Sequence, residues 1–281
     1  MPRCILITGC SSGIGRCVAA GLKQRGYRVF ASARGPEDVA ALAEQGFESC
    51  RLDVSDSSSV REAVEFVLER SGGALYALFN NAGYGQPGAV EDLSRALLRE
   101  QFETNLFGAQ ELTNLLLPAM RRQGAGRIIY NSSVLGLVAM RYRGAYIASK
   151  FAMEGLVDTL RMELQGSGVH VSLIEPGPVT SSFRRNAHAM FRRNIDVQHS
   201  PHREVYAGVE RRLAKQDDAG VPFTLGPEAV LDKVVHALES RRPRARYYVT
   251  VPTYGFGLLR RILPTRVLDW LLIKASGAEN R

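Results

Sequence analysis

The amino-acid sequence predicts an α/β protein: a Rossmann-type, doubly wound parallel sheet of about seven strands with helices on both faces. Apolar runs of strand length alternate with segments of helical period. The early runs are nearly continuously apolar, as burial on both faces of a parallel sheet requires. Glycine or polar residues follow nearly every strand. The length of 281 residues suits one hydrophobic core, so we expect a single Rossmann-type domain over residues 1–281.

The first third of the chain supplies four strands separated by helices. We expect strands at 3–8, 28–33, 47–52 and 75–80, and helices at 13–25, 36–45 and 58–70. Asp56 or Ser57 precedes the third helix and can cap its first turn. A helix between successive strands implies right-handed βαβ units, which make the sheet parallel.

The rest of the chain continues the alternation less regularly. We expect a helix at 95–122 that bends near Pro118, a strand at 126–132, a helix at 145–165, a strand at 169–175, a helix at 227–240 and a strand at 246–251. Residues 178–226 are polar and rich in Arg and His, and a segment this long between regular elements predicts a substrate-binding insert. Residues 253–276 are apolar with arginines at helical spacing, which predicts an amphipathic C-terminal extension.

Composition narrows the partners and the compartment. The net charge of +8 is spread in small clusters that match no nucleic-acid module, so we expect no nucleic-acid partner. The four cysteines, Cys4, Cys10, Cys17 and Cys50, have no zinc or redox spacing, and we expect reduced thiols and no metal. The first residues have no signal-peptide layout, and no apolar run reaches the ~18 residues of a membrane span. We therefore expect a cytoplasmic protein.

A glycine-rich turn joins the first strand to the first helix. Glycines permit a tight turn and a close approach of backbone N–H groups to a diphosphate, and the helix N-terminus adds partial positive charge. The spacing is G-x-x-x-G-x-G, and a purely structural turn is the alternative. The expected cofactor-binding residues here are Thr8, Gly9, Ser11, Ser12, Gly13, Ile14 and Gly15.

The end of the second strand indicates which dinucleotide binds. An Asp or Glu there binds the ribose 2′-hydroxyl of NAD, whereas an Arg accommodates the 2′-phosphate of NADP. This strand ends at Ala33 and is followed by Arg34, with no carboxylate before Glu37. We therefore expect NADP(H), with Arg34 and a hydroxyl of Ser11 or Ser12 on the phosphate; a solvated arginine is the alternative.

Tyr146 and Lys150 form a Y-x-x-x-K pair at the start of a predicted helix. Residues four apart share a helical face, so both side chains can reach one ligand. A nearby ammonium favours phenolate and lowers the pKa of a tyrosine from about 10, which suits acid–base chemistry. Ser133 ends the fifth strand just before this helix, at the sheet edge that binds ligands.

Taken together, the motifs resemble those of the short-chain dehydrogenase/reductase family. They are TGCSSGIG, LDV at 52–54, NNAG at 80–83, NLFG at 105–108, NSS at 131–133, YIASK at 146–150 and EPGPVT at 175–180, in the family's order. The resemblance covers residues 3–183 and the last strand. Within the family, the chain is most similar to bacterial NADP-dependent aldehyde reductases and, more distantly, to hydroxysteroid and retinol dehydrogenases.

The resemblance implies a role for each matching residue. Tyr146 would be the general acid/base, Ser133 would orient the substrate oxygen, and Lys150 would bind the nicotinamide ribose and lower the pKa of Tyr146. Asn105 would hold a water that links Lys150 to solvent. The remaining cofactor contacts would be Asp53 and Val54 at adenine, Asn81, Ala82 and Gly83 at the adenosine ribose, and Pro176, Gly177, Val179 and Thr180 at the carboxamide.

The resemblance also implies a lipophilic carbonyl or alcohol substrate: an aliphatic aldehyde, a retinoid or a steroid-like molecule. Arginines at 184–185 and 192–193 leave a 3-oxoacyl thioester open, and a non-catalytic NADP(H)-binding sensor is a further alternative. A homodimer or homotetramer would form through the helices that carry Asn105 and Tyr146. The segment 253–276 would cover the pocket, make a subunit contact or lie on a membrane surface.

Overall fold

The computed structural model describes residues 3–215 and 222–279, so residues 216–221 of the predicted insert and the extreme ends of the predicted domain lie outside it. Seven parallel strands form one sheet in the order β3-β2-β1-β4-β5-β6-β7, which confirms the predicted fold class. Their bounds are β1 Cys4–Ile7, β2 Arg28–Ala33, β3 Glu48–Arg51, β4 Ala77–Asn80, β5 Gly126–Asn131, β6 Val169–Glu175 and β7 Arg246–Tyr248.

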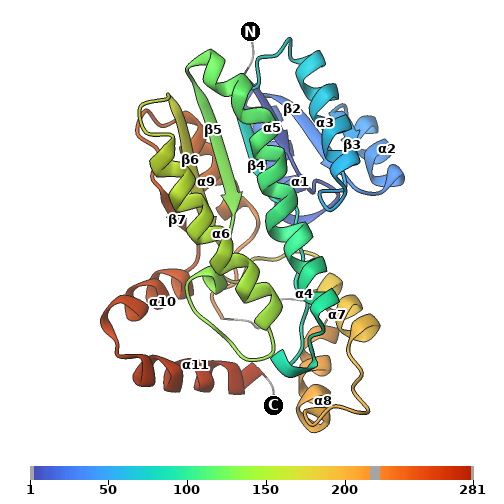
Figure 1. Cartoon of the computed structure of the whole chain (residues 1–281), viewed down its shortest axis with the longest axis vertical. Coiled ribbons are helices and arrows are strands. Elements are labelled where there is room, and N and C mark those ends of the chain that lie inside the picture. The colour runs from blue at the N-terminus through green and yellow to red at the C-terminus, as the bar shows by residue number, and fades with distance from the viewer. Residues whose placement is uncertain (1–2, 216–221, 280–281) are drawn as a thin grey trace.

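Helices cover both faces of the sheet, and each face has its own apolar core (Figure 1). On one face, β1, β4 and β5 pack against α3 (Ser57–Arg70), α5 (Gly108–Gln123) and α6 (Gly144–Glu163). The other face packs against α1 (Gly13–Gln24), α2 (Pro36–Glu44) and α9 (Glu228–Glu239). The strand order reverses between β1 and β4, and ligands of such sheets bind in the crevice at that point.

The expected helix at 95–122 is interrupted, but not at Pro118. α4 (Arg95–Phe102) is followed by a wider, π-helical turn at Glu103–Phe107 and then by α5, which runs across Pro118. A Cβ on Gly108 would lie 1.7 Å from the backbone oxygen of Val54, so the chain passes very close to the β3 loop here. Wider turns of this kind are frequent at functional sites, and this one carries Asn105.

The last expected strand is also shorter than predicted. β7 ends at Tyr248, and Val251, expected in that strand, begins α10 (Val251–Ile262). Pro252 occupies the start of this helix, where its missing N–H removes no helical hydrogen bond.

The expected insert and C-terminal extension are both helical (Figure 1). The insert forms α7 (Phe183–Asn194) and α8 (Arg203–Ala214), whose residues Phe191 and Tyr206 belong to a third apolar core. The extension is two helices, α10 and α11 (Thr265–Glu279). Within the described ranges, no helix combines the length and apolarity needed to cross a bilayer.

Candidate active site

The glycine-rich turn leaves β1 and begins α1 at the strand-order reversal. Ser12 is the N-cap of α1, and its side chain makes no capping hydrogen bond to the first turn. Gly13 has a φ of +54°, and a Cβ there would lie 3.0 Å from the Cβ of Ser181, in the loop after β6. A Cβ on Gly15 would lie 2.2 Å from the Gly9 oxygen. A turn of this shape, with open helix N–H groups, fits a dinucleotide diphosphate.

Asparagines tie the ends of β1, β4 and β5 together. The backbone N–H groups of Asn81 and Ala82 donate to Thr8 Oγ1 at 2.9 and 2.8 Å. The Asn81 amide donates to the carbonyls of Thr8 and Gly9 at 2.9 and 3.2 Å, and it accepts from Asn131 Nδ2 at 2.9 Å. These bonds fix the floor of the crevice beside the glycine-rich turn.

The residues expected around the adenosine lie farther along the same edge. Arg34 directly follows β2 and is exposed. Asp53 follows β3, and its carboxylate accepts from the backbone N–H and the hydroxyl of Ser55 at 3.0 and 2.7 Å. Val54 is buried. Ser11 is half-buried in the turn.

Tyr146, Ser133 and Lys150 come together at the carboxyl ends of β5 and β6. Tyr146 and Lys150 lie on the first turns of α6, and the Lys150 ammonium is 5.6 Å from the Tyr146 ring centre. Lys150 Nζ donates to the Asn131 carbonyl at 2.7 Å. Ser133 Oγ accepts from the Leu135 N–H at 3.1 Å and faces the Tyr146 hydroxyl closely enough to hydrogen-bond with it. All three line one cavity.

Burial shifts the pKa values of Tyr146 and Lys150, and the sequence did not indicate this burial. Removal from water raises the pKa of Tyr146 to about 12, and the hydrogen bond with Ser133 only partly opposes this rise. Burial lowers the pKa of Lys150 to about 8, against the attraction of Glu154. In the protein alone the pKa of Tyr146 is therefore raised, not lowered as expected, because burial has the largest effect on it.

Asn105 lies beside this group but does not line the cavity. Its side chain is buried and donates to the Tyr84 carbonyl at 3.0 Å and to Ser149 Oγ at 3.1 Å. Its oxygen accepts from the Tyr84 N–H at 3.1 Å. The amide thus joins the loop after β4 to the residue next to Lys150. The expected water-holding role stays a prediction.

A buried charged cluster lies behind the catalytic group. Ser132 Oγ donates to Glu154, one helical turn after Lys150. Arg246, on β7, pairs with Glu154 at 3.0 Å, with Asp158 at 2.6 Å and with Glu175 at 3.1 Å. Glu175 is fully buried, and burial raises its pKa to about 9, helped by the neighbouring Glu154 carboxylate. Burial also raises the pKa of Glu154, so removal from water opposes ionisation of both glutamates.

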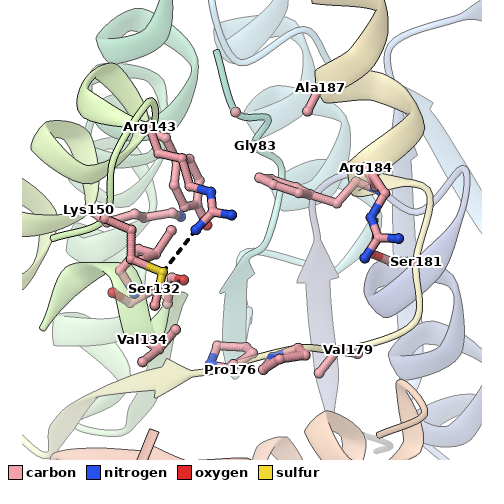
Figure 2. Close-up of a pocket in the computed structure, with 18 of the residues that line it drawn as sticks. Gly83, Ser132, Val134, Arg143, Lys150, Pro176, Val179, Ser181, Arg184 and Ala187 are labelled. Carbon is pink, nitrogen blue, oxygen red and sulfur yellow. Dashed lines mark hydrogen bonds between the residues drawn. The ribbon is translucent and has the colours of Figure 1, made fainter. Parts of the chain in front are cut away.

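The cavity has a volume of about 420 Å³ and extends from the glycine-rich turn to the C-terminal helices. Of the expected site residues, those that line it are Ile14, Asn81, Gly83, Ser133, Tyr146, Lys150, Pro176, Gly177 and Val179. Phe183 stacks edge-on against Tyr146, with ring centres 5.2 Å apart, and forms an apolar wall. Figure 2 shows Arg143 and Arg184 entering from opposite sides.

Sequence reasoning missed several lining residues. Thr180 is exposed and lies outside the cavity, whereas the next residue, Ser181, lines it. Met140 and Arg143 reach it from the loop before α6, where their side chains contact each other at 2.9 Å (Figure 2). The remaining lining residues from α7, α8, α10 and α11 include Ala187, Arg212, Leu213, Pro252, Phe256 and Ala275. The long insert at 178–226 was the only sequence signal for part of this wall.

The chain is similar to known oxidoreductases. The family model of the short chain dehydrogenases matches residues 3–191. An uncharacterised oxidoreductase of Escherichia coli K12, YbbO, is 44% identical over 97% of this chain and 94% of its own length. Human retinol dehydrogenase 8 is 34% identical over 87% of this chain and 80% of its own. An NADPH-dependent 3-dehydrocapnine reductase of Ornithobacterium rhinotracheale is 31% identical over 97% of this chain and 96% of its own.

Solved structures agree with the fold. A Burkholderia phymatum short-chain dehydrogenase/reductase in complex with NAD has a TM-score of 0.77 and 25% identity, covering 96% of this chain and 95% of its own. An alcohol dehydrogenase from Thermococcus sibiricus, complexed with 5-hydroxy-NADP, has a TM-score of 0.68 and 25% identity, covering 89% and 97%. Structures of this kind hold either dinucleotide.

Proposed function

The chain belongs to the short-chain dehydrogenase family and is an oxidoreductase that acts on CH–OH or C=O groups, and from that premise we propose that it is an NADP(H)-dependent reductase of lipophilic carbonyls. One observation carries the proposal: Tyr146, Ser133 and Lys150 meet in an otherwise largely apolar cavity that opens onto the glycine-rich turn. A polar group of this kind at the end of an apolar pocket is typical of a site that orients one reactive carbonyl.

The cofactor preference is argued from the end of β2. Arg34 follows the strand, where a carboxylate would repel a 2′-phosphate and a guanidinium would pair with it. The first amides of α1 would bind the diphosphate. The loop from Pro176 to Val179 would hold the nicotinamide end, since Pro176, Gly177 and Val179 line the cavity that contains Tyr146. Asn81 and Gly83, which also line it, would lie near the adenosine ribose.

The protein's own part in the reaction is proton transfer and orientation. A bound nicotinamide supplies hydride for reduction or accepts it for oxidation. Tyr146, kept protonated by burial, donates its proton to the carbonyl oxygen, and the Ser133 hydroxyl donates a hydrogen bond to that same oxygen. Lys150, held by the Asn131 carbonyl, places a positive charge beside the phenolate that forms.

The substrate class follows from the cavity wall. Val134, Leu135, Phe183 and Phe256 surround the catalytic group and would exclude water from a long aliphatic or polycyclic substrate. Aliphatic aldehydes, retinoids and steroid-like ketones fit this description, and one of the relatives is named as a retinol dehydrogenase.

A second substrate class is favoured by three arginines. Arg143, Arg184 and Arg212 line the cavity, and guanidinium groups bind phosphate and other oxyanions. A 3-oxoacyl thioester that carries a phosphate-bearing arm is therefore the alternative substrate. A non-catalytic sensor is disfavoured, because Tyr146, Ser133, Lys150 and Asn105 are all present.

The test measures cofactor oxidation at 340 nm with purified protein, using NADPH or NADH against aliphatic aldehydes, retinal, steroid ketones and 3-oxoacyl thioesters. We expect faster oxidation of NADPH than of NADH. Arg34→Asp should reduce or reverse this preference, because the new carboxylate repels the 2′-phosphate. Arg122→Asp, which changes an exposed arginine in the last turn of α5, is the matched control and should keep the preference. An NADH preference in the parent protein would overturn the Arg34 argument.

A further inference from the structure

The two C-terminal helices present apolar side chains to solvent. On α10, Val251, Tyr254, Leu258 and Ile262 are all more than half exposed, at 61, 52, 59 and 63%. Their spacing of three, four and four residues puts them in one stripe along the helix. Contiguous exposed apolar surface of this kind marks an interaction site, whereas isolated exposed residues do not.

α11 also carries exposed apolar residues. Val267, Trp270 and Ile273 are 45, 55 and 45% exposed and lie at successive intervals of three residues. The Lys274 ammonium lies 4.0 Å from the centre of the Trp270 ring. A tryptophan with an apolar body, a polar N–H and a cation beside it is typical of a membrane–water interface.

The opposite sides of the same helices form part of the catalytic cavity. Pro252 and Phe256 on α10 and Ala275 on α11 line it. Leu268 and Leu272 pack with Phe256 against Val134 and Val138, in the loop that follows Ser133. The helix pair therefore separates the cavity from the exposed apolar stripes, at one end of the molecule (Figure 1).

We propose that α10 and α11 dock this protein onto the surface of an anionic lipid bilayer. Leu258, Ile262 and Trp270 enter the headgroup boundary, and the basic side chains pair with lipid phosphates. The helices lie on the bilayer, since neither is long enough to cross it. When the protein is docked in this way, the helix pair that separates the cavity from the exposed apolar stripes faces the bilayer. Lipophilic substrates dissolve in that bilayer. The docking itself does not depend on the proposed reaction.

Charge favours a bilayer over a second copy of the chain as the occupant. Residues 251–277 contain four basic residues, Arg260, Arg261, Arg266 and Lys274, and one acidic residue, Asp269. Two copies that met through this surface would bring like charges together, whereas an anionic bilayer attracts each exposed cation. Arg260 is tied back to the Leu137 carbonyl at 2.6 Å, so the cations left to face lipid are Arg261, Arg266 and Lys274.

Trp270 makes the proposal directly measurable, because it is the chain's single tryptophan. The experiment titrates the full chain with vesicles of phosphatidylcholine containing about one third phosphatidylglycerol, and separately with pure phosphatidylcholine. Trp270 emission and co-sedimentation are recorded together. We expect a blue shift and co-sedimentation with the anionic vesicles, and at least tenfold weaker binding to the neutral ones, since each cation near the surface contributes about fivefold.

Two variants and one control locate the contact. Leu258→Ser with Ile262→Ser should weaken vesicle binding at least tenfold, and Arg261→Gln with Arg266→Gln should weaken it only for the anionic vesicles. Neither pair lines the cavity, so turnover of a water-soluble carbonyl should be unchanged. Met162→Ser, which alters a 61% exposed apolar residue on α6, should bind as the parent protein does.

Two results would overturn the proposal. The first is the absence of both a blue shift and co-sedimentation with anionic vesicles. The second is a blue shift that depends on protein concentration without vesicles and that Leu258→Ser with Ile262→Ser removes, since this would identify a second copy as the occupant. If the parent protein binds vesicles but reduces no carbonyl substrate, the proposed function is contradicted and the docking proposal is not.

Discussion

The proposed chemistry depends on the protonation state of Lys150. Burial lowers the pKa of its ammonium to about 8, while the Tyr146 hydroxyl, with a pKa of about 12, keeps its proton across the working range. Below pH 8 the site therefore contains a neutral proton donor beside a positive charge. Above pH 8 the charge that stabilises the developing phenolate is lost first.

This order predicts the pH dependence of carbonyl reduction. We expect kcat/KM to be flat below about pH 8 and to fall about tenfold per pH unit above it, as Lys150 loses its proton. Lys150→Arg keeps its charge in this range, so the fall near pH 8 should disappear even if the overall rate is lower. Steady-state assays from pH 6 to 10 measure both profiles. An unchanged fall in Lys150→Arg would show that another group titrates.

The sequence predicted the polar residues that meet in the cavity, but not their surroundings. Ser133 and Asn81 were found because their motifs lie at strand ends, which parallel sheets bring to one edge. Tyr146 and Lys150 were found because their spacing of four residues puts them on one helical face. The Tyr146 pKa was misjudged because spacing reveals a neighbouring charge but not the depth of burial. Ser181 was missed in favour of Thr180, because the side of a loop that faces a cavity has no periodicity in the sequence.

Among the secondary-structure elements, Arg246 links two strands and one helix, β7, β6 and α6, through ion pairs. Arg246 on β7 pairs with Glu175 on β6 and with Glu154 and Asp158 on α6, and these partners are buried or mostly buried. The cluster fixes the edge strand against the helix that carries Tyr146 and Lys150. Removing the guanidinium would leave buried carboxylates without their counter-ion.

We therefore expect Arg246→Ala to lower the free energy of unfolding by about 3–5 kcal/mol at pH 7. Arg25→Ala is the control: its pair with Glu239, at 3.5 Å, is exposed and should contribute under about 1 kcal/mol. Urea unfolding followed by circular dichroism measures each value. Similar losses in the two variants would mean that the cluster does not stabilise the fold.

Strand and helix positions followed from the sequence wherever periodicity decided them. The expected strands at 28–33 and 169–175 match β2 and β6, because each is a short, mainly apolar segment rich in residues that favour strands. The break at Glu103–Phe107 lies instead where Gly108 approaches the Val54 backbone, which is a tertiary contact. Such contacts leave no local pattern.

For the whole molecule, a second exposed apolar surface lies on α5 and α6. Leu115 on α5 and Leu156 on α6 are 37 and 36% exposed, and Phe107, in the π-helical turn just before α5, is 50% exposed. These helices cover the same face of the sheet (Figure 1). We propose that this surface forms the homodimer contact, away from the C-terminal helices.

Leu115→Glu with Leu156→Glu should convert a dimer to a monomer, because four buried carboxylates would face each other across a two-fold axis. Sedimentation velocity measures the mass. The control, Leu258→Ser with Ile262→Ser, should remain a dimer. A monomeric parent protein, or a dimer that survives both glutamates, would contradict this contact.

The central claim is that Tyr146 supplies the proton in an NADPH-dependent reduction, and the measurement that tests it most directly is the turnover of Tyr146→Phe. With NADPH and the best carbonyl substrate, the account predicts a loss of roughly 10²–10⁴-fold in kcat, with NADPH affinity by calorimetry unchanged. Tyr254→Phe, an exposed tyrosine on α10, should retain full turnover. A Tyr146→Phe protein as active as the parent would contradict the catalytic assignment.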